Sequence, residues 1–81
     1  MARVTLCSSL APFTDGELEL ELEVSNVRQL FQALGARYPE LRRQLDTGLG
    51  VAIDGEIYQD ALLQPIAPDS EVILITKIEG G

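Results

Sequence analysis

Two residue types that support catalysis and metal binding are nearly missing from the sequence. It contains no histidine, and Cys7 is its single cysteine. Without histidine the chain can build neither a Ser-His-Asp triad nor a Cys-His pair, and it lacks the commonest metal ligand. One cysteine can form neither an internal disulfide nor a structural zinc site of the usual Cys/His types. We therefore expect a chain that is not an enzyme, holds no metal and resides in a reducing compartment.

Basic residues and long apolar stretches are also scarce. Six Lys and Arg residues stand against 13 Asp and Glu residues, which gives a formal charge of −7. Such a surface repels phosphate backbones, so we expect no nucleic-acid partner and favour a protein with a basic docking face. No apolar run approaches the roughly 20 residues that span a bilayer, and residues 1–6 do not resemble a signal peptide. The sequence predicts one domain over residues 1–81, without a membrane segment and cytoplasmic.

The N-terminal third alternates between apolar and polar residues, which is typical of strands with one buried face. Residues 3–10 are predicted as a first strand and residues 12–16 as a turn. The second strand covers residues 17–24, and the two strands should pair as an antiparallel hairpin. Its polar positions are all glutamates: Glu17, Glu19, Glu21 and Glu23. We interpret this row as a solvated face that discourages edge-to-edge pairing; a site for a metal or a basic partner is the alternative.

A helix follows, for which Ser25 is the predicted N-cap. Its apolar stripe has the spacing i, i+3, i+4, i+7 and consists of Val27, Leu30, Phe31 and Leu34. Pro39 should end the helix, and Leu41 and Leu45 should continue the apolar face.

The second half of the chain predicts short strands around a tight turn. Asp54-Gly55 is the sequence of a two-residue hairpin turn between residues 51–53 and 57–58. Residues 61–66 read as an irregular crossing, and residues 71–78 as a strand whose 72–75 run is apolar on both faces, as in a central strand. The fold class is therefore α+β: a β-grasp (ubiquitin-like) roll, with a mixed sheet of four to five strands covered by one main helix.

The chain ends in Glu79-Gly80-Gly81, which is the feature that points to function. Glycine has no Cβ, so Gly80 and Gly81 can pass through a narrow channel into a partner's active site. The terminal carboxylate is ionised at neutral pH and is a poor electrophile. Adenylation with ATP by a partner enzyme would activate it, and a sulfur nucleophile could then displace the adenylate and leave a thiocarboxylate on Gly81.

The sequence resembles the MoaD/ThiS family of ubiquitin-like sulfur carrier proteins, which includes the small subunit of molybdopterin synthase. The likeness covers nearly the whole chain and is carried by residues 3–6, 27–34, 37–41, 51–55 and 69–73 and by the Gly80-Gly81 end. It departs at the end, where residues 76–81 read Thr-Lys-Ile-Glu-Gly-Gly and many molybdopterin-type members have Pro-Pro-Val-x-Gly-Gly. It also departs in the turn before the last strand, where residues 68–72 read Pro-Asp-Ser-Glu-Val in place of an Asp-Gly-Asp-Glu-Val pattern.

The resemblance implies a sulfur donor for cofactor biosynthesis, with the molybdopterin type favoured by the length of the chain. It implies three partners: a ubiquitin-activating-like adenylating enzyme, a sulfur donor protein, and an acceptor such as a synthase large subunit. No cofactor would be bound permanently, since ATP is used by the partner. The alternatives are a sulfur carrier for thiamin or amino-acid synthesis, a protein modifier conjugated through Gly81, and a pure binding module.

The last strand also suggests where a partner binds. If Val72 and Leu74 face the helix, Ile73 and Ile75 point outward, beside Cys7 when the first and last strands pair. We expect these residues, together with Ile78, to form a partner interface, with Glu79 and Gly80 giving access to the tail. For the apolar patch the alternatives are a covering loop and ordinary exposed apolar area. For Cys7, which we interpret as a small strand residue, the alternative is a redox or transfer role.

Overall fold

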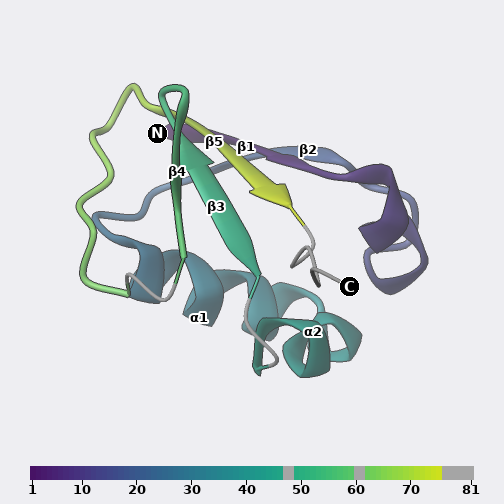
Figure 1. The fold of residues 1–81 in the computed structure, drawn as a ribbon. Coiled ribbons are helices and arrows are strands. Elements are labelled where there is room, and N and C mark those ends of the chain that lie inside the picture. The colour runs from purple at the N-terminus through teal and green to yellow at the C-terminus, as the bar shows by residue number, and fades with distance from the viewer. Residues whose placement is uncertain (47–48, 60–61, 76–81) are drawn as a thin grey trace, which may run out of the picture.

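Five strands form one mixed sheet, and a helix packs across one of its faces (Figure 1). The computed structural model describes residues 1–46, 49–59 and 62–75. In chain order the elements are β1 (Ala2–Leu6), the 3₁₀ helix η1 (Ser8–Phe13), β2 (Glu19–Leu22), α1 (Val27–Arg37), the 3₁₀ helix η2 (Pro39–Leu41), α2 (Arg42–Asp46), β3 (Gly50–Ile53), β4 (Glu56–Tyr58) and β5 (Glu71–Ile75). The strand order is β2-β1-β5-β3-β4, and among the described strands only β1 and β5 pair in parallel. This is the predicted β-grasp roll, so the fold class is confirmed.

The first hairpin is confirmed, but its first strand is shorter than predicted. β1 pairs with β2 in antiparallel register, with Val4 opposite Leu20. After Leu6 the chain leaves the sheet and turns into η1, so the prediction of a strand through residue 10 is wrong. The turn carries Leu10 into the core, where it is only 1% exposed, and Pro12 in η1 could not donate to a strand ladder.

Helix α1 begins one residue later than predicted. Asn26, not Ser25, is the N-cap, because its Oδ1 accepts a hydrogen bond from the Gln29 backbone N–H at 2.8 Å. The Gln29 side chain reaches back and accepts from the Ser25 N–H, which satisfies a second backbone donor. The Ser25 carbonyl accepts from the Ile66 N–H, so Ser25 belongs to a contact with the distant crossing segment.

The end of α1 agrees with the sequence prediction. The helix stops at Arg37, two residues before Pro39, and the chain continues through η2 into α2. Leu41 and Leu45 are buried and extend the apolar face of α1. The helical layer consequently covers the inner face of the sheet with one continuous apolar surface. In the described residues no helix has the length and apolar character required to cross a bilayer.

The β3–β4 hairpin turns at Asp54-Gly55, as predicted. Both residues have positive φ, 50° and 90°, which is the requirement of a type I′ turn. The Asp54 carboxylate also accepts from the Ser70 hydroxyl at 2.9 Å and from the Glu71 N–H at 3.0 Å. Ser70, at a position where the sequence departs from the family pattern, is 3% exposed and ties the hairpin to the start of β5.

β5 is central in the sheet, as its apolar sequence predicts. It pairs with β1 on one side and β3 on the other, and its Val72 and Leu74 are fully buried. The predicted extension through residues 76–78 lies outside the described residues. The core is formed by side chains from both layers: Ala2, Val4, Leu6, Leu10, Leu20, Val24, Val27, Leu30, Leu34, Tyr38, Leu41, Leu45, Leu49, Val51, Ile53, Ile66, Val72 and Leu74.

Candidate functional site

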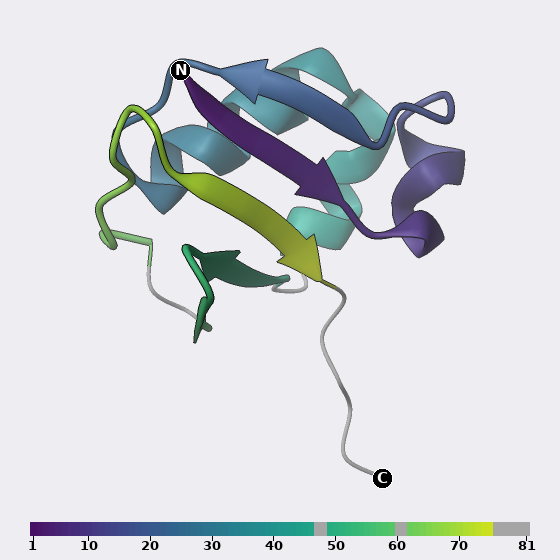
Figure 2. The same ribbon diagram turned by 90° about the horizontal axis from the view of Figure 1, so that it is seen from above.

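The face of the sheet that points away from α1 is the candidate partner surface. Figure 2 shows the helical layer on the far side of the strands, so that this face is open. Within β5, Val72 and Leu74 turn toward the helix, and therefore Ile73 and Ile75 turn outward, as predicted. Ile73 remains 44% exposed, whereas Ile75 is half-buried.

Strand pairing places two further apolar residues beside them. Ile73 is opposite Ala52 of β3, and Ala52 is opposite Ile57 of β4, which is 66% exposed. Residues directly opposite in neighbouring strands share a face, so these side chains form one row across the sheet. We call Ala52, Ile57, Ile73 and Ile75 the open-face patch.

Gly50 allows Ile75 to close this patch at the end of β5. The two residues are paired across β3 and β5. A Cβ on Gly50 would lie 2.9 Å from Ile75 Cγ1, which is too close for any other residue without displacement of the isoleucine. The Ile75 side chain therefore lies over the Gly50 backbone, at the point from which the chain continues toward residues 76–81.

Cys7 lies beside the end of β5. Its backbone N–H donates to the Leu74 carbonyl at 3.2 Å, which places Cys7 next to the C-terminal end of β5. The side chain is half-buried against the core, and its Sγ is 3.1 Å from Ser9 Oγ. The participation of Cys7 in a partner interface stays a prediction.

Acidic side chains border the open-face patch on the β2 side. In the register of the sheet Arg3 lies between Glu21 and Glu71, and Thr5 separates Glu19 from Ile73. Two exposed carboxylates thus flank one guanidinium, and the rim is negative overall. A partner with an apolar centre and basic surroundings would be complementary to this face.

The predicted glutamate row is divided by the structure. Glu17 lies before β2 and accepts from the Tyr38 hydroxyl at 3.1 Å, with the Arg37 guanidinium 3.7 Å away, so it links β2 to the end of α1. Glu19 and Glu21 are exposed on the sheet. Over residues 1–46, 49–59 and 62–75 no three Cys, Asp or Glu side chains gather as a metal site.

Tyr58, in the edge strand β4, has a raised pKa. The Tyr58 hydroxyl donates to Glu56 Oε2 at 2.7 Å. This hydrogen bond raises the pKa of Tyr58 above its ordinary value of 10.0, because ionisation would put two negative charges side by side. At neutral pH Tyr58 is therefore a neutral donor at the edge of the sheet.

Ile78, Glu79, Gly80 and Gly81 lie outside the described residues. The sequence predicts Ile73 and Ile75 as part of this surface, whereas Gly50, Ala52 and Ile57 are not predicted. The signal was present, because alternation from the Asp54-Gly55 turn puts Ala52 and Ile57 on one face.

Comparisons with known proteins agree with the fold and extend to the tail. The sequence profile of the ThiS family matches residues 4–81. None of the curated proteins matches the chain by sequence. One similar solved structure is that of the Amycolatopsis orientalis BexX/CysO complex, with a TM-score of 0.81, 16% identity and 100% of both chains covered. The small archaeal modifier protein 1 (SAMP1) of Methanosarcina acetivorans has a TM-score of 0.78 and 19% identity over 99% of this chain and 95% of that one. A candidate molybdopterin converting factor subunit 1 from Pyrococcus furiosus has a TM-score of 0.72 and 15% identity, over 95% of this chain and 97% of that one.

Proposed function

Because the chain belongs to the ThiS family, we propose that it is a sulfur carrier whose Gly81 carboxylate is the working group. The observation that carries the proposal is the match of the family profile through Gly80-Gly81, on a fold in which β5 delivers the chain to that end from the middle of the sheet. Among acceptors we favour a molybdopterin-type synthase large subunit, because a structure that resembles this fold is named as a molybdopterin converting factor subunit 1. Sulfur transfer to thiamin or amino-acid synthesis is the alternative pathway.

The chemistry requires two displacements at the chain end. An oxygen of the Gly81 carboxylate attacks the α-phosphorus of ATP in the partner enzyme and releases pyrophosphate, which gives an acyl-adenylate. Hydrosulfide then attacks the acyl carbon, and AMP leaves with the oxygen. The product is a thiocarboxylate, which carries sulfur in a form ready for nucleophilic transfer. The chain contributes the reacting carbon and no catalytic side chain, so ATP is bound and used by the partner enzyme.

The open-face patch would hold the adenylating enzyme while the tail enters its active site. Residues 76–81 are six residues, and six extended residues span at most about 20 Å. A partner that binds at Ile73 and Ile75 therefore needs its adenylation centre within that reach. The acidic rim around Arg3 favours a basic partner surface. In the same proposal the chain itself catalyses no step and works in the cytoplasm.

Intact-mass analysis tests the proposal directly. The chain is incubated with ATP, a ThiS-type adenylating enzyme and a sulfide source, and we expect the exchange of one oxygen atom for one sulfur atom. A chain lacking Gly81 is the control and should remain unchanged. Failure of the intact chain with several competent activating enzymes would exclude the carrier function, whereas a pure binding module would tolerate the deletion.

A protein modifier is the second candidate, since the SAMP1 structure that resembles this fold is named as a modifier. Both functions require adenylation of Gly81, so the products must separate them. The chain has a single lysine, Lys77, and trypsin cuts after it. A conjugated target lysine would thus carry an Ile-Glu-Gly-Gly remnant. Detection of that remnant favours the modifier; a free thiocarboxylate without it favours the carrier.

A further inference from the structure

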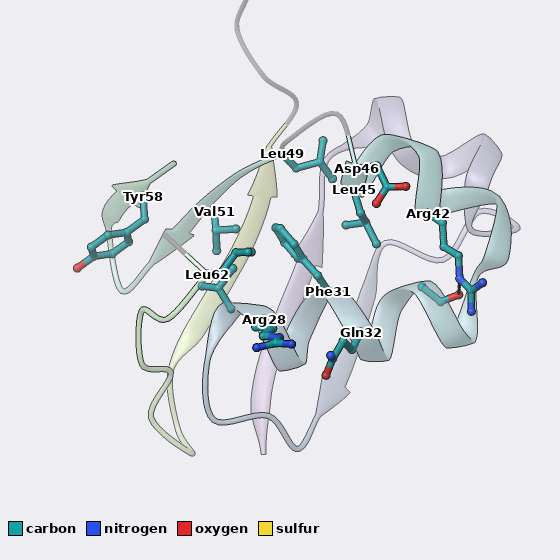
Figure 3. A pocket seen from close by; sticks show the side chains of 12 residues that line it. Arg28, Phe31, Gln32, Arg42, Leu45, Asp46, Leu49, Val51, Tyr58 and Leu62 are labelled. Atoms are coloured by element: carbon teal, nitrogen blue, oxygen red, sulfur yellow. Dashed lines mark hydrogen bonds between the residues drawn. The ribbon is translucent and has the colours of Figure 1, made fainter. Parts of the chain in front are cut away.

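A second surface lies on the opposite side of the molecule from the open-face patch. It is a pocket of about 720 Å³ between α1, α2 and the β3–β4 hairpin, open to solvent on one side (Figure 3). Val51 and Tyr58 line it from the sheet, and they are paired with each other, so both point to the helix side. Ala52 and Ile57 point the other way. The two surfaces are therefore independent, and nothing in the chemistry of Gly81 depends on the pocket.

The floor of the pocket is apolar and partly exposed. Phe31 of α1 projects into its centre, and Leu45 and Leu49 form the wall beyond it (Figure 3). Leu62 closes one end and is 47% exposed. The burial of this exposed apolar area by a ligand would be favourable, because it removes apolar surface from water.

Two arginines stand at the ends of this floor. Arg28 and Gly35 are seven residues apart on α1, so they lie on one face of the helix, separated by about 10 Å. The Arg42 Nε donates to the Gly35 carbonyl at 3.0 Å, which fixes that guanidinium above the last turns of the helix. In the described part of the chain the Arg28 guanidinium has neither a hydrogen-bond nor an ion-pair partner.

The charge of the pocket is opposite to that of the chain. Among the described residues that line it, Arg28 and Arg42 stand against one carboxylate, Asp46, in a protein with a net charge of −7. The two guanidiniums belong to the Arg28 end and the Gly35 end of α1, with Phe31 between them, and match a ligand with carboxylates at its ends and apolar groups between them. In an extended peptide, residues four apart point to the same side and lie about 13 Å apart. Glu-Leu-Leu-Leu-Glu therefore presents two carboxylates and a leucine on one face, and the flexible arginine and glutamate side chains adjust to the remaining difference in span.

We propose that this pocket is a docking site for an acidic, leucine-rich peptide segment of a partner protein. The two carboxylates of the segment pair with Arg28 and Arg42, and its apolar side chains cover Phe31 and Leu62. A second copy of the chain is disfavoured as occupant because two molecules of charge −7 repel each other. The partner could bind while the open-face patch is occupied.

A titration of the ¹⁵N-labelled full chain tests the proposal. The probe is the heptapeptide acetyl-Ser-Glu-Leu-Leu-Leu-Glu-Ser-amide, and its matched controls carry Lys in place of Glu or Ser in place of Leu. We expect amide shifts over residues 28–35 and 42–51 with the Glu/Leu peptide, and at least tenfold weaker binding of both controls. Saturation absent up to millimolar peptide, or shifts centred on Ile73, would overturn the proposal.

Charge reversal provides the decisive comparison. Arg28→Glu should weaken the Glu/Leu peptide at least tenfold and bring the Lys/Leu peptide into binding. The change leaves the fold intact, because an acidic residue in the first turn of α1 is favourable to the helix dipole. Arg43→Glu is the matched control: Arg43 is exposed on α2 and does not line the pocket, so affinity should change less than twofold. Equal effects of the two reversals would refute the pairing, and dimerisation abolished by Arg28→Glu would show that a second copy is the occupant.

Discussion

Replacement of Ile73 by aspartate is the sharpest test of the open-face patch. Ile73 is 44% exposed in the free chain, and complete burial of an isoleucine side chain is worth about 1.5–3 kcal/mol. Docking can therefore gain about 0.7–1.3 kcal/mol from the remaining area, which is roughly a three- to ninefold effect on Kd. Ile73→Ala should show that loss. Ile73→Asp also buries an unpaired charge, which adds about 3 kcal/mol or more, so its Kd should rise at least about 100-fold.

The assay is calorimetric titration of each variant with the adenylating enzyme, alongside thermal unfolding of the variant alone. Leu63→Asp is the matched control, because Leu63 is 77% exposed and contributes to neither the open-face patch nor the pocket. Its affinity should equal that of the unmodified chain. An Ile73→Asp chain that binds within twofold of the unmodified protein would refute the docking surface, and an equal loss in Leu63→Asp would show that the effect is not local.

Three further predictions concern the fold. Asn26→Ala should lower the free energy of unfolding in urea by about 1 kcal/mol, whereas Ser25→Ala should change it by less than about 0.5 kcal/mol; the reverse order would mean that Ser25 is the cap. Leu30→Ala should destabilise by about 2–5 kcal/mol in the same assay, since Leu30 is fully buried on α1, and a loss under 1 kcal/mol would contradict its place in the core. The raised pKa of Tyr58 means that the hydrogen bond to Glu56 stabilises the fold fully below pH 10 and is lost as pH rises through the folded-state pKa. Glu56→Gln should move the phenol absorbance titration to lower pH, and an unchanged midpoint would dismiss the bond as its cause.

Much of the fold could be predicted because local patterns and tertiary pairing agree. The Asp54-Gly55 turn needs only its own two residues, and β5 is central because its apolar residues on both faces suit no edge. The strand predicted through residue 10 failed for the opposite reason. Leu6 and Leu10 are compatible with a continued strand, but the burial of Leu10 requires a turn that alternation cannot reveal.

The candidate sites also contain features that one segment of the sequence predicts and features that depend on distant contacts. The outward direction of Ile73 follows from period-two alternation within one strand, so the sequence is sufficient. The N-cap is Asn26 and not the neighbouring Ser25, whose carbonyl accepts a hydrogen bond from the Ile66 N–H, 41 positions away along the chain. The pocket could not be predicted at all, since its lining is contributed by α1, α2, the hairpin and Leu62, and no single segment contains its pattern.

The parallel pairing of β1 with β5 has a mechanical consequence. A partner that grips the chain beyond Ile75 and pulls applies its force along the axis of β5. The strand is held by a ladder on each side, with Val4 opposite Val72 and Val51 opposite Leu74. Force in this direction loads all the bonds of both ladders in shear at once, instead of opening them one by one as at a frayed edge. The domain should therefore resist unfolding when a partner pulls on its C-terminal end, as happens when it is transferred from one protein to the next.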